Sequence, residues 1–438
     1  MNITMKKILF ALALACTLQV AYAQKPDAEM QKAVEKALAA SQDAKKAAKP
    51  ATWMNLGKAY LTAYTNPMTN VTTGIDKATF TMMFQEKPSA VSQVTLDGQP
   101  FEKQSFSSID VYFNAAGQLA FVDVTHPSVP GDLLGEAAKA YSKAYELGGK
   151  DKDIDPKLQE IAQNYYNDAF TAYSLGNMAK ASELFKGAAD VSAMPPCSAR
   201  NDDAAYNCAF TAKETGNFDR AEEYYNLCLS NGYTSEGNVY ASLSECALAK
   251  ADTLAAKNYL ATGLTAFPDN GAILTNLINL YLTTKEDPKK IVNLLDEAKK
   301  AMPDNASLYY VEGNILAGIK DFDGALAAYE KALSIAPNYD FAYYGIGNIA
   351  LKKGEDLVEE MNALDVREWK KYDAMQAQLV EIYISAIEPF EKCYEVSQIP
   401  EVKAAAADYL KRLNFQLRNQ DPKYQAAYEK WEAVVGQQ

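Results

Sequence analysis

The residue types that most often carry chemistry are sparse in this chain. His126 is the only histidine among 438 residues, so no histidine pair is available for a metal site or a proton relay. It precedes Pro127 after a strand-like segment, and we interpret it as a surface residue. The sequence contains no nucleophile elbow, P-loop or dinucleotide fingerprint. We therefore expect no enzyme activity, no metal and no cofactor.

The cysteines leave two interpretations open. Five follow the N-terminal segment, at Cys197, Cys208, Cys228, Cys246 and Cys393. None forms a C-x-x-C pair, so their spacing is not that of a metal site. They can serve as small buried residues, or one disulfide can form between two of the four cysteines at positions 197, 208, 228 and 246. The spacing does not determine the connectivity.

Asparagine and tyrosine recur at regular intervals. An asparagine amide has two N–H donors and a carbonyl acceptor, which suits pairing with a peptide backbone. Tyrosine offers a broad contact surface at low entropic cost. Both types also serve in helix capping and packing, which is the competing interpretation. The recurring residues are Asn279, Asn314 and Asn348, the pair Tyr310 and Tyr344, and the sets Tyr166, Asn167, Tyr206 and Asn207.

These residues lie in segments that repeat. Around Gly313, Ala325, Tyr329 and Ala332 stand at the spacing that two crossing antiparallel helices need, with small residues at the contacts and one bulky side chain between them. Pro337 then ends the second helix. The Tyr309 to Asn314 segment returns about 34 residues later, with Gly347 in the place of Gly313. A fixed period of this length predicts a helix–turn–helix repeat.

The spacing resembles the tetratricopeptide-repeat family over most of the chain. Further residues that match the family's two helices are Trp53, Leu56, Gly57, Tyr60, Ala181, Phe185, Ala221 and Tyr225. The resemblance implies a mainly α fold, a helical solenoid of about seven to eight helix pairs. It also implies that the first helix of each pair lines a concave groove for an extended or helical protein segment. The recurring asparagines and tyrosines named above would line that groove.

Two repeats are interrupted. Between Gly57 and the next matching second helix, the sequence is strand-like at Val91–Leu96, Ile109–Phe113 and Leu119–Val124, with a turn at 114–117. We expect a small β-rich insert there. The other interruption has helical spacing and predicts a protruding helical hairpin. The expected segments are a signal peptide (1–23), a lead-in helix and the first repeat helix (24–61), the β-rich insert (62–132), the solenoid (133–354), the helical-hairpin insert (355–385), and a last repeat with capping helices (386–438).

The first 23 residues have the pattern of an export signal. Lys6 and Lys7 precede an apolar run, and Ala21-Tyr22-Ala23 provides a cleavage site. No later apolar stretch is long enough to span a membrane. The net charge of −13 disfavours nucleic acid as a partner. We expect a periplasmic or secreted protein of Gram-negative type that scaffolds or recruits other proteins of the cell envelope.

The alternative is an envelope glycan-binding or nutrient-binding protein on a similar helical scaffold. Such proteins are normally lipidated, and Cys16 is the residue that would carry the lipid. Ala13 occupies the position where a lipidation signal usually has leucine, so we favour simple cleavage after Ala23.

Metabolic labelling with a palmitate analogue separates the two alternatives. Cleavage after Ala23 removes Cys16, so the mature protein should carry no label, and its mass should correspond to a chain that begins at Gln24. A labelled protein whose first residue is Cys16 would contradict this expectation, and a Cys16→Ser variant is the control for labelling at that position.

Overall fold

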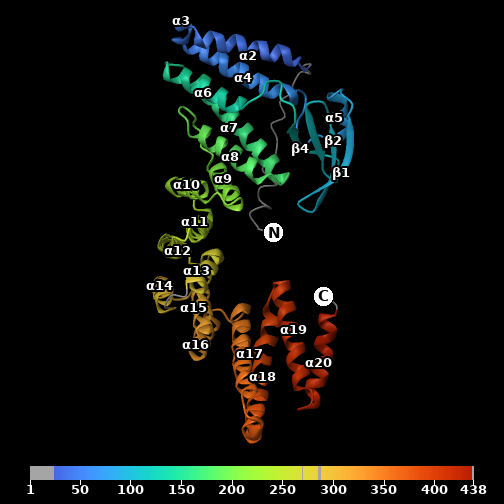
Figure 1. The fold of residues 1–438 in the computed structure, drawn as a ribbon, viewed down its shortest axis with the longest axis vertical. Helices are drawn as coiled ribbons and strands as arrows, with labels where there is room; N and C mark the ends of the chain where they lie inside the picture. Colours follow the sequence, from blue (N-terminus) through green and yellow to red (C-terminus); the bar gives the residue numbers. More distant parts are fainter. Residues whose placement is uncertain (1–23, 269, 285–287, 437–438) are drawn as a thin grey trace. The chain divides into compact units, whose positions relative to one another are not determined.

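The computed structural model describes residues 24–268, 270–284 and 288–436, and the expected signal peptide lies outside them. The chain divides into two compact units, Met1–Tyr233 and Thr234–Gln438. Helices make up most of both units, and a small four-stranded sheet lies in the first (Figure 1). The expected fold class, a mainly α helical-repeat protein with a β-rich insert near its N-terminus, is confirmed.

Unit 1 is a row of helix pairs preceded by one lead-in helix. Helix α2 packs against α4, α4 against α6, α7 against α8, and α9 against α10. The insert separates α4 from α6 in sequence, yet these two helices form one pair. The helices are α2 (Asp27–Gln42), α3 (Ala44–Ala47), α4 (Pro50–Thr65), η1 (Asn66–Met68), α5 (Lys77–Met83), α6 (Leu133–Glu146), α7 (Asp151–Ser174), α8 (Met178–Ser192), α9 (Asp202–Glu214) and α10 (Phe218–Ser230).

Unit 2 continues the same pattern. Helix α11 packs against α12, α15 against α16, α17 against α18, and α19 against α20. The helices are η2 (Ser235–Gly237), α11 (Asn238–Ala249), α12 (Thr253–Ala266), α13 (Gly271–Thr284), α14 (Pro288–Ala301), α15 (Ala306–Gly318), α16 (Phe322–Ile335), α17 (Asp340–Asn362), η3 (Val366–Glu368), α18 (Trp369–Val396), α19 (Pro400–Leu417) and α20 (Pro422–Val435). Helix α16 ends at Ile335, two residues before Pro337.

Glycine and an aromatic ring meet where the paired helices cross. A Cβ on Gly57 would lie 2.7 Å from the ring of Tyr141, and a Cβ on Gly347 would lie 2.7 Å from the ring of Phe390. Gly313 is still closer to the ring of Tyr329. The absent side chain therefore admits the ring of the second helix, which explains the spacing of these residues in the sequence.

The insert contains one antiparallel sheet in the order β1-β2-β3-β4. Strands β3 (Ile109–Phe113) and β4 (Leu119–Val124) occupy the expected residues, and β1 (Ala90–Leu96) begins one residue earlier. Strand β2 (Gln99–Ser105) was not expected, because it is polar and contains Pro100. Its signal was the preceding Asp97-Gly98 turn, in which both residues have positive φ.

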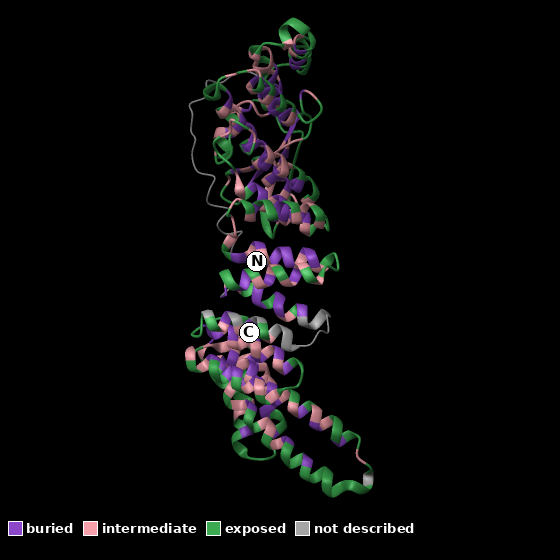
Figure 2. Ribbon diagram, turned by 90° about the vertical axis from the view of Figure 1, so that its left-hand side faces the viewer, coloured by how far each residue is buried: buried purple, intermediate pink, exposed green. Residues whose placement is uncertain are grey.

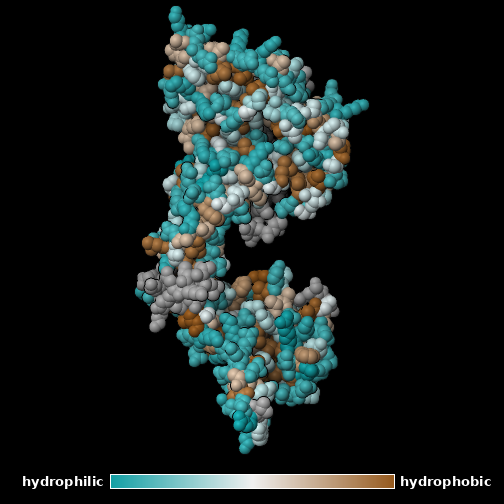
Figure 3. Space-filling view, viewed as in Figure 1, coloured by the Kyte–Doolittle hydropathy of each residue, from teal (hydrophilic) through white to brown (hydrophobic). Residues whose placement is uncertain are grey.

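The two faces of this sheet have different partners. One face buries Ile109, Val111 and Phe113 against Phe80 and Phe84, the latter pair lying on α5 and at its C-terminal end. On the other face, the ring of Phe121 on β4 lies 6.1 Å from that of Phe170 on α7. Strand β4 therefore packs on the first helix of the second pair. Figure 3 shows hydrophobic atoms gathered over this region of unit 1, among mostly hydrophilic surface.

The two long helices α17 and α18 form an antiparallel pair joined by residues 363–368. Leu357, Met361, Met375 and Leu379 are buried between them. Near the turn, the side chain of Trp369 is 60% exposed. Figure 2 shows exposed residues over most of the far half of this pair.

The cysteines are mostly buried and form no disulfide in the part of the chain that the structure describes. The buried ones are Cys208, Cys228, Cys246 and Cys393. Burial raises the pKa of the Cys208 thiol to about 12. Of the helices that the structure describes, none combines the length and the apolar character needed to cross a bilayer.

The Gly313→Ala substitution tests the helix crossing. Its Cβ would collide with the buried ring of Tyr329, so we expect unit 2 to lose about 1–2 kcal/mol of stability even though alanine favours helix. Thermal unfolding followed by circular dichroism measures the loss. The matched control is Gly271→Ala, because no described atom lies within 4 Å of a Cβ at that position. Equal unfolding midpoints for the two variants would contradict the steric explanation.

Candidate functional site

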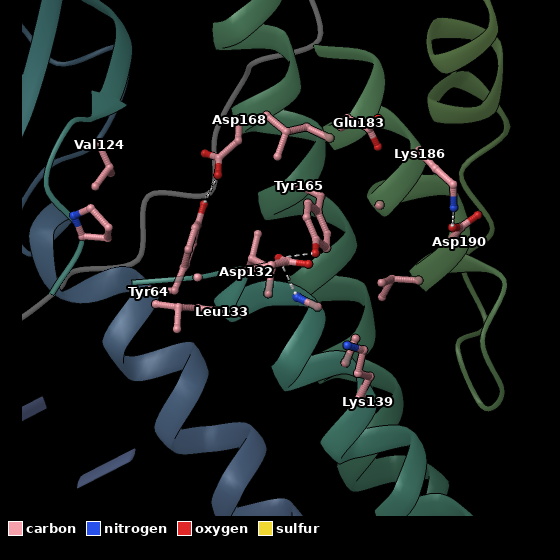
Figure 4. Close-up of a pocket in the computed structure, with 18 of the residues that line it drawn as sticks. Tyr64, Val124, Asp132, Leu133, Lys139, Tyr165, Asp168, Glu183, Lys186 and Asp190 are labelled. Carbon is pink, nitrogen blue, oxygen red and sulfur yellow. Dashed lines mark hydrogen bonds and ion pairs between the residues drawn. The ribbon is translucent and has the colours of Figure 1, made fainter. Parts of the chain in front are cut away.

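A cavity of about 680 Å³ lies in unit 1 where the insert joins the helix pairs. Its walls come from the end of α4, the end of β4, the start of α6, the middle of α7, and α8. Tyr64, Asp132, Tyr165, Asp168 and Asp190 are among the lining residues, and Figure 4 shows their side chains around the same space. The cavity therefore combines tyrosine rings with several carboxylates.

Helix α7 binds the chain on both sides of the insert. The Tyr64 hydroxyl, at the end of α4, donates to Asp168 Oδ2 over 3.0 Å. The Tyr165 hydroxyl donates to Asp132 Oδ1, at the start of α6, over 2.5 Å (Figure 4). Tyr165 and Asp168 are three residues apart, so they share one face of α7. One helix face thus fixes both ends of the insert.

A hydrogen bond also joins the two ends of the insert to each other. Asn66 follows α4 and is buried. Its Nδ2 donates to the Oγ of buried Ser128 over 2.8 Å, although the two residues are 62 positions apart. This bond joins the two ends of the insert, and Asn66 also bonds to the Lys25 backbone ahead of α2.

Two glycines shape the cavity wall around Tyr165. Asp132 caps helix α6 by accepting from the Gly135 N–H over 3.0 Å. A Cβ on Gly135 would collide with the Asp132 carboxylate and would lie 2.9 Å from the Tyr165 hydroxyl oxygen. A Cβ on Gly187 would lie 2.8 Å from the Tyr165 ring. Only glycine at these two positions leaves room for the observed contacts.

The carboxyl of Asp168 has a raised pKa. Burial raises the pKa of its carboxyl to about 6. The hydrogen bond from Tyr64 and the charge of Lys180 act in the opposite direction, and the charge of Asp123 adds to the increase. Burial also raises the pKa of the Tyr64 and Tyr165 hydroxyls, with the neighbouring carboxylates adding to the effect. Both tyrosines therefore stay neutral hydrogen-bond donors.

The carboxylates around the cavity differ in their partners. Glu183 pairs with Arg220 over 2.7 Å, and Asp190 pairs with Lys186 over 2.5 Å. Within the described ranges, Asp132 and Asp168 form no ion pair, and their bonds come from neutral donors. In the same part of the chain, no group of three or more histidine, cysteine, aspartate or glutamate residues could hold a metal ion.

In unit 1, the structure brings some of the sequence-predicted groove residues into contact. Asn207 Nδ2 donates to the Tyr166 hydroxyl over 3.2 Å, and Asn167 accepts from Gln163 over 2.9 Å. The Tyr206 ring packs edge-on against that of Tyr225. Asn207, Tyr166 and Tyr206 thus link neighbouring helices of the repeats, whereas the Asn167 bond lies within α7.

The predicted groove residues of unit 2 also make contacts within the repeats. Asn314 Oδ1 accepts from the Tyr329 hydroxyl over 2.7 Å, and its side chain also bonds to Tyr310. Asn348 bonds to Tyr344 in the equivalent way. Asn279 is exposed on α13. Asn314 and Asn348 therefore pack the repeat while remaining partly accessible, and Asn279 is the most accessible of the three.

Sequence reasoning did not single out the cavity carboxylates. Two of them did have a signal: Asp132 and Tyr165 are 33 residues apart, and Asp190 and Tyr224, joined over 2.5 Å, are 34 apart. These spacings are close to the repeat period, but the two pairs are not at equivalent places, since Tyr165 lies on the first helix α7 and Tyr224 on the second helix α10. The Tyr64–Asp168 bond spans 104 residues across the insert and has no such signal.

The comparisons with known proteins identify the repeat. Residues 203–231 and 306–339 match models of the tetratricopeptide repeat. A curated relative, the TPR repeat-containing protein MJ1428 of Methanocaldococcus jannaschii, is 30% identical over 131 residues, which cover 29% of this chain and 22% of the relative. The chain thus contains tetratricopeptide repeats at these two places, and it spans about a fifth of the length of that relative.

Solved structures of other repeat proteins are similar at low scores. One is a TPR repeats protein from Bacteroides fragilis NCTC 9343, with 18% identity over 57% of this chain and 97% of that chain and a TM-score of 0.28. Another is a tetratricopeptide repeat protein from Parabacteroides merdae ATCC 43184, with 14% identity over 57% and 98% of the two chains and a TM-score of 0.32.

The raised pKa of Asp168 predicts a pH dependence of stability. Between about pH 4 and pH 6 the folded chain keeps a proton that the unfolded chain has lost. The free energy of unfolding should therefore fall as the pH rises through this window, by up to about 3 kcal/mol at about 1.4 kcal/mol per pKa unit. Urea unfolding of unit 1 from pH 3.5 to pH 7.5 measures it.

The Asp168→Asn variant should lose this component of the pH dependence. The Asp203→Asn variant is the control, because it neutralises, at an exposed position, a carboxylate that accepts an equivalent bond from the Tyr233 hydroxyl over 2.6 Å. If the profiles of Asp168→Asn and of the unmodified protein were parallel from pH 4 to pH 6, the assignment to Asp168 would be wrong.

Proposed function

We propose that this protein binds segments of other proteins in the cell envelope through the concave face of its repeats. Tetratricopeptide repeats generally mediate protein–protein interactions, and this chain carries them at residues 203–231 and 306–339. That match is the observation on which the proposal depends. The protein acts as a scaffold or recruiting factor and performs no catalysis.

The contact surface that we assign lies in unit 2. Asn279, Asn314 and Asn348 recur on the first helices of three consecutive pairs, α13, α15 and α17. Tyr329 holds the carbonyl of the Asn314 amide, so the orientation of this amide is fixed before a partner arrives. A fixed amide loses little conformational entropy on binding, which favours recognition of a peptide backbone.

The equivalent surface of unit 1 is less open. Phe170 lies on the first helix of its pair, and Phe121 of the insert packs against it. Lys180, near the start of α8, also pairs with Asp123 of β4 over 3.4 Å. The insert thus covers part of the face that a partner segment would use. This contact is the reason that the proposal places partner binding in unit 2.

Export is part of the same proposal. The positive, apolar and cleavage-site segments of residues 1–23 support secretion with cleavage after Ala23. The partners would then be envelope or secreted proteins. The acidic character of the chain supports protein partners over nucleic acid, since its net charge of −13 repels phosphate.

The test is a triple variant, Asn279→Ala with Asn314→Ala and Asn348→Ala. Crosslinking and pull-down from the native envelope, followed by mass spectrometry, identify the partners of the unmodified protein. We expect the triple variant to lose them, because three backbone-pairing amides at about 1 kcal/mol each correspond to more than a hundredfold in affinity.

Two controls make this result interpretable. Asn258→Ala with Asn293→Ala removes exposed amides from the second helices α12 and α14, and should retain every partner. Circular dichroism of the triple variant checks the fold, since Asn314 and Asn348 also bond to tyrosines. A correctly folded triple variant that still captures all native partners would refute the assignment of the surface.

A further inference from the structure

The wall of the cavity at the base of the insert carries more carboxylates than ammonium groups: Asp132, Asp168, Glu183 and Asp190 line it together with Lys139 and Lys186. Asp132 and Asp168 both line it. Each accepts hydrogen bonds from a tyrosine hydroxyl, and Asp132 also from the Gly135 N–H. In the part of the chain that the structure describes, neither carboxylate forms an ion pair. Both charges raise the pKa of Tyr165, whose hydroxyl bonds to Asp132 in Figure 4. An unpaired charge in a partly buried site is costly, and a cationic ligand relieves the cost.

The remaining wall of the cavity suits an organic cation better than a metal. Tyr64 and Tyr165 add aromatic rings, and the faces of such rings attract guanidinium and ammonium groups. Glycine at positions 135 and 187 leaves room for the Tyr165 side chain in the cavity wall, because a Cβ at either position would collide with it. The described residues provide no set of three metal ligands at this place. Carboxylates and aromatic rings around a cavity of about 680 Å³ are the elements of a site for a charged side chain.

We propose that this cavity binds the guanidinium or ammonium group of an arginine or lysine side chain of a protein partner, with Asp168 and Asp132 as its anionic ligands. This assignment rests on the proposed function only in that the partner is a protein. Asp168 and Asp132 supply the charge, and Tyr64 and Tyr165 hold the two carboxylates in place. The cavity in unit 1 is then a second recognition element, in addition to the amide-lined face in unit 2.

The titration of Asp168 gives the site a pH dependence. The groups that face its carboxyl are Tyr64 on α4, Lys180 on α8 and Asp123 on β4. The two tyrosines keep their protons through the acidic and neutral range. Because the pKa of Asp168 is raised to about 6, its carboxylate loses its charge as the pH falls through that value. Cation binding should therefore be strong at neutral pH and weak at pH 5.

The test uses the whole mature protein and a blocked pentapeptide, Ala-Ala-Arg-Ala-Ala. The comparison peptide has citrulline in place of arginine, which keeps the shape and removes the charge. Titration calorimetry at pH 7.5 and low salt should show saturable binding of the arginine peptide in about the millimolar range. The citrulline peptide should bind at least about tenfold more weakly. Equal binding of the two peptides, or no saturable binding of either, would overturn the proposal.

Variants assign the binding to the cavity. Asp168→Asn and Asp132→Asn should each weaken binding of the arginine peptide about tenfold or more, the loss expected when one charged partner is neutralised. Asp203→Asn should leave the affinity within about twofold, because its bond to Tyr233 lies outside the cavity wall. A far-ultraviolet spectrum confirms that each variant is folded. An unchanged affinity in a folded Asp168→Asn variant would refute the site.

Two further measurements compare peptide binding at two pH values and peptide binding by the triple asparagine variant. Lowering the pH from 7.5 to 5 should weaken the binding of the unmodified protein but not the residual binding of Asp168→Asn. The triple asparagine variant of unit 2 should bind the arginine peptide normally. If the peptide fails to bind while that triple variant still loses its native partners, the cavity assignment falls and the proposed function stands. The reverse result refutes the proposed surface in unit 2 alone.

Discussion

The whole chain depends on how closely two antiparallel helices can approach. A helix pair buries its apolar stripe only if the backbones come together where they cross, and a side chain on the first helix prevents this. Gly57, Gly313 and Gly347 solve the problem in the same way, since each faces an aromatic ring of the second helix. The rings are buried, with Tyr141 and Tyr329 at 1% and 2% exposure. Each pair then presents one face to its neighbour, and within each unit the stacked pairs bury their apolar residues between them.

The insert is tolerated because it leaves this crossing intact. Gly57 and Tyr141 still meet, although a complete sheet lies between them in sequence. Asn66 and Ser128 hold the two ends of the insert together, and α7 holds the residues on either side. The repeat thus gains a subdomain without losing its packing. The cavity lies where the insert meets the helix pairs. Helices, the end of strand β4 and the loop before α6 come together there, and their side chains leave the space between them unfilled.

The repeats could be predicted from the sequence because the residues that define them are close together and recur at a fixed period. Glycine, alanine and tyrosine at fixed spacing reflect contacts within about 34 residues, so one segment predicts the next. Strands β3 and β4 were accessible for a similar reason, through alternating apolar residues and a turn. Strand β2 was not predicted because its residues are polar although it lies between two other strands. Its only sequence signal was the Asp97-Gly98 turn.

Less of the candidate site could be predicted from the sequence. The groove residues were chosen from the repeat alone, and the structure then shows that Asn314 and Asn207 also bond to tyrosines. The burial that raises the pKa of Asp168 depends on where the insert folds back. A contact between residues 104 positions apart follows from tertiary packing, and no local rule contains it.

The position of the insert has a consequence for the order of folding. In an ordinary repeat a short turn connects the two helices, so their meeting costs little chain entropy. With the whole insert as the connection, closing the first pair costs about 3 kcal/mol more while the insert is unstructured, because the cost grows with the logarithm of loop length. A folded sheet removes this penalty, since the Asn66–Ser128 bond already brings the ends together. The later repeats can therefore assemble first, and the N-terminal pair closes once the sheet has formed.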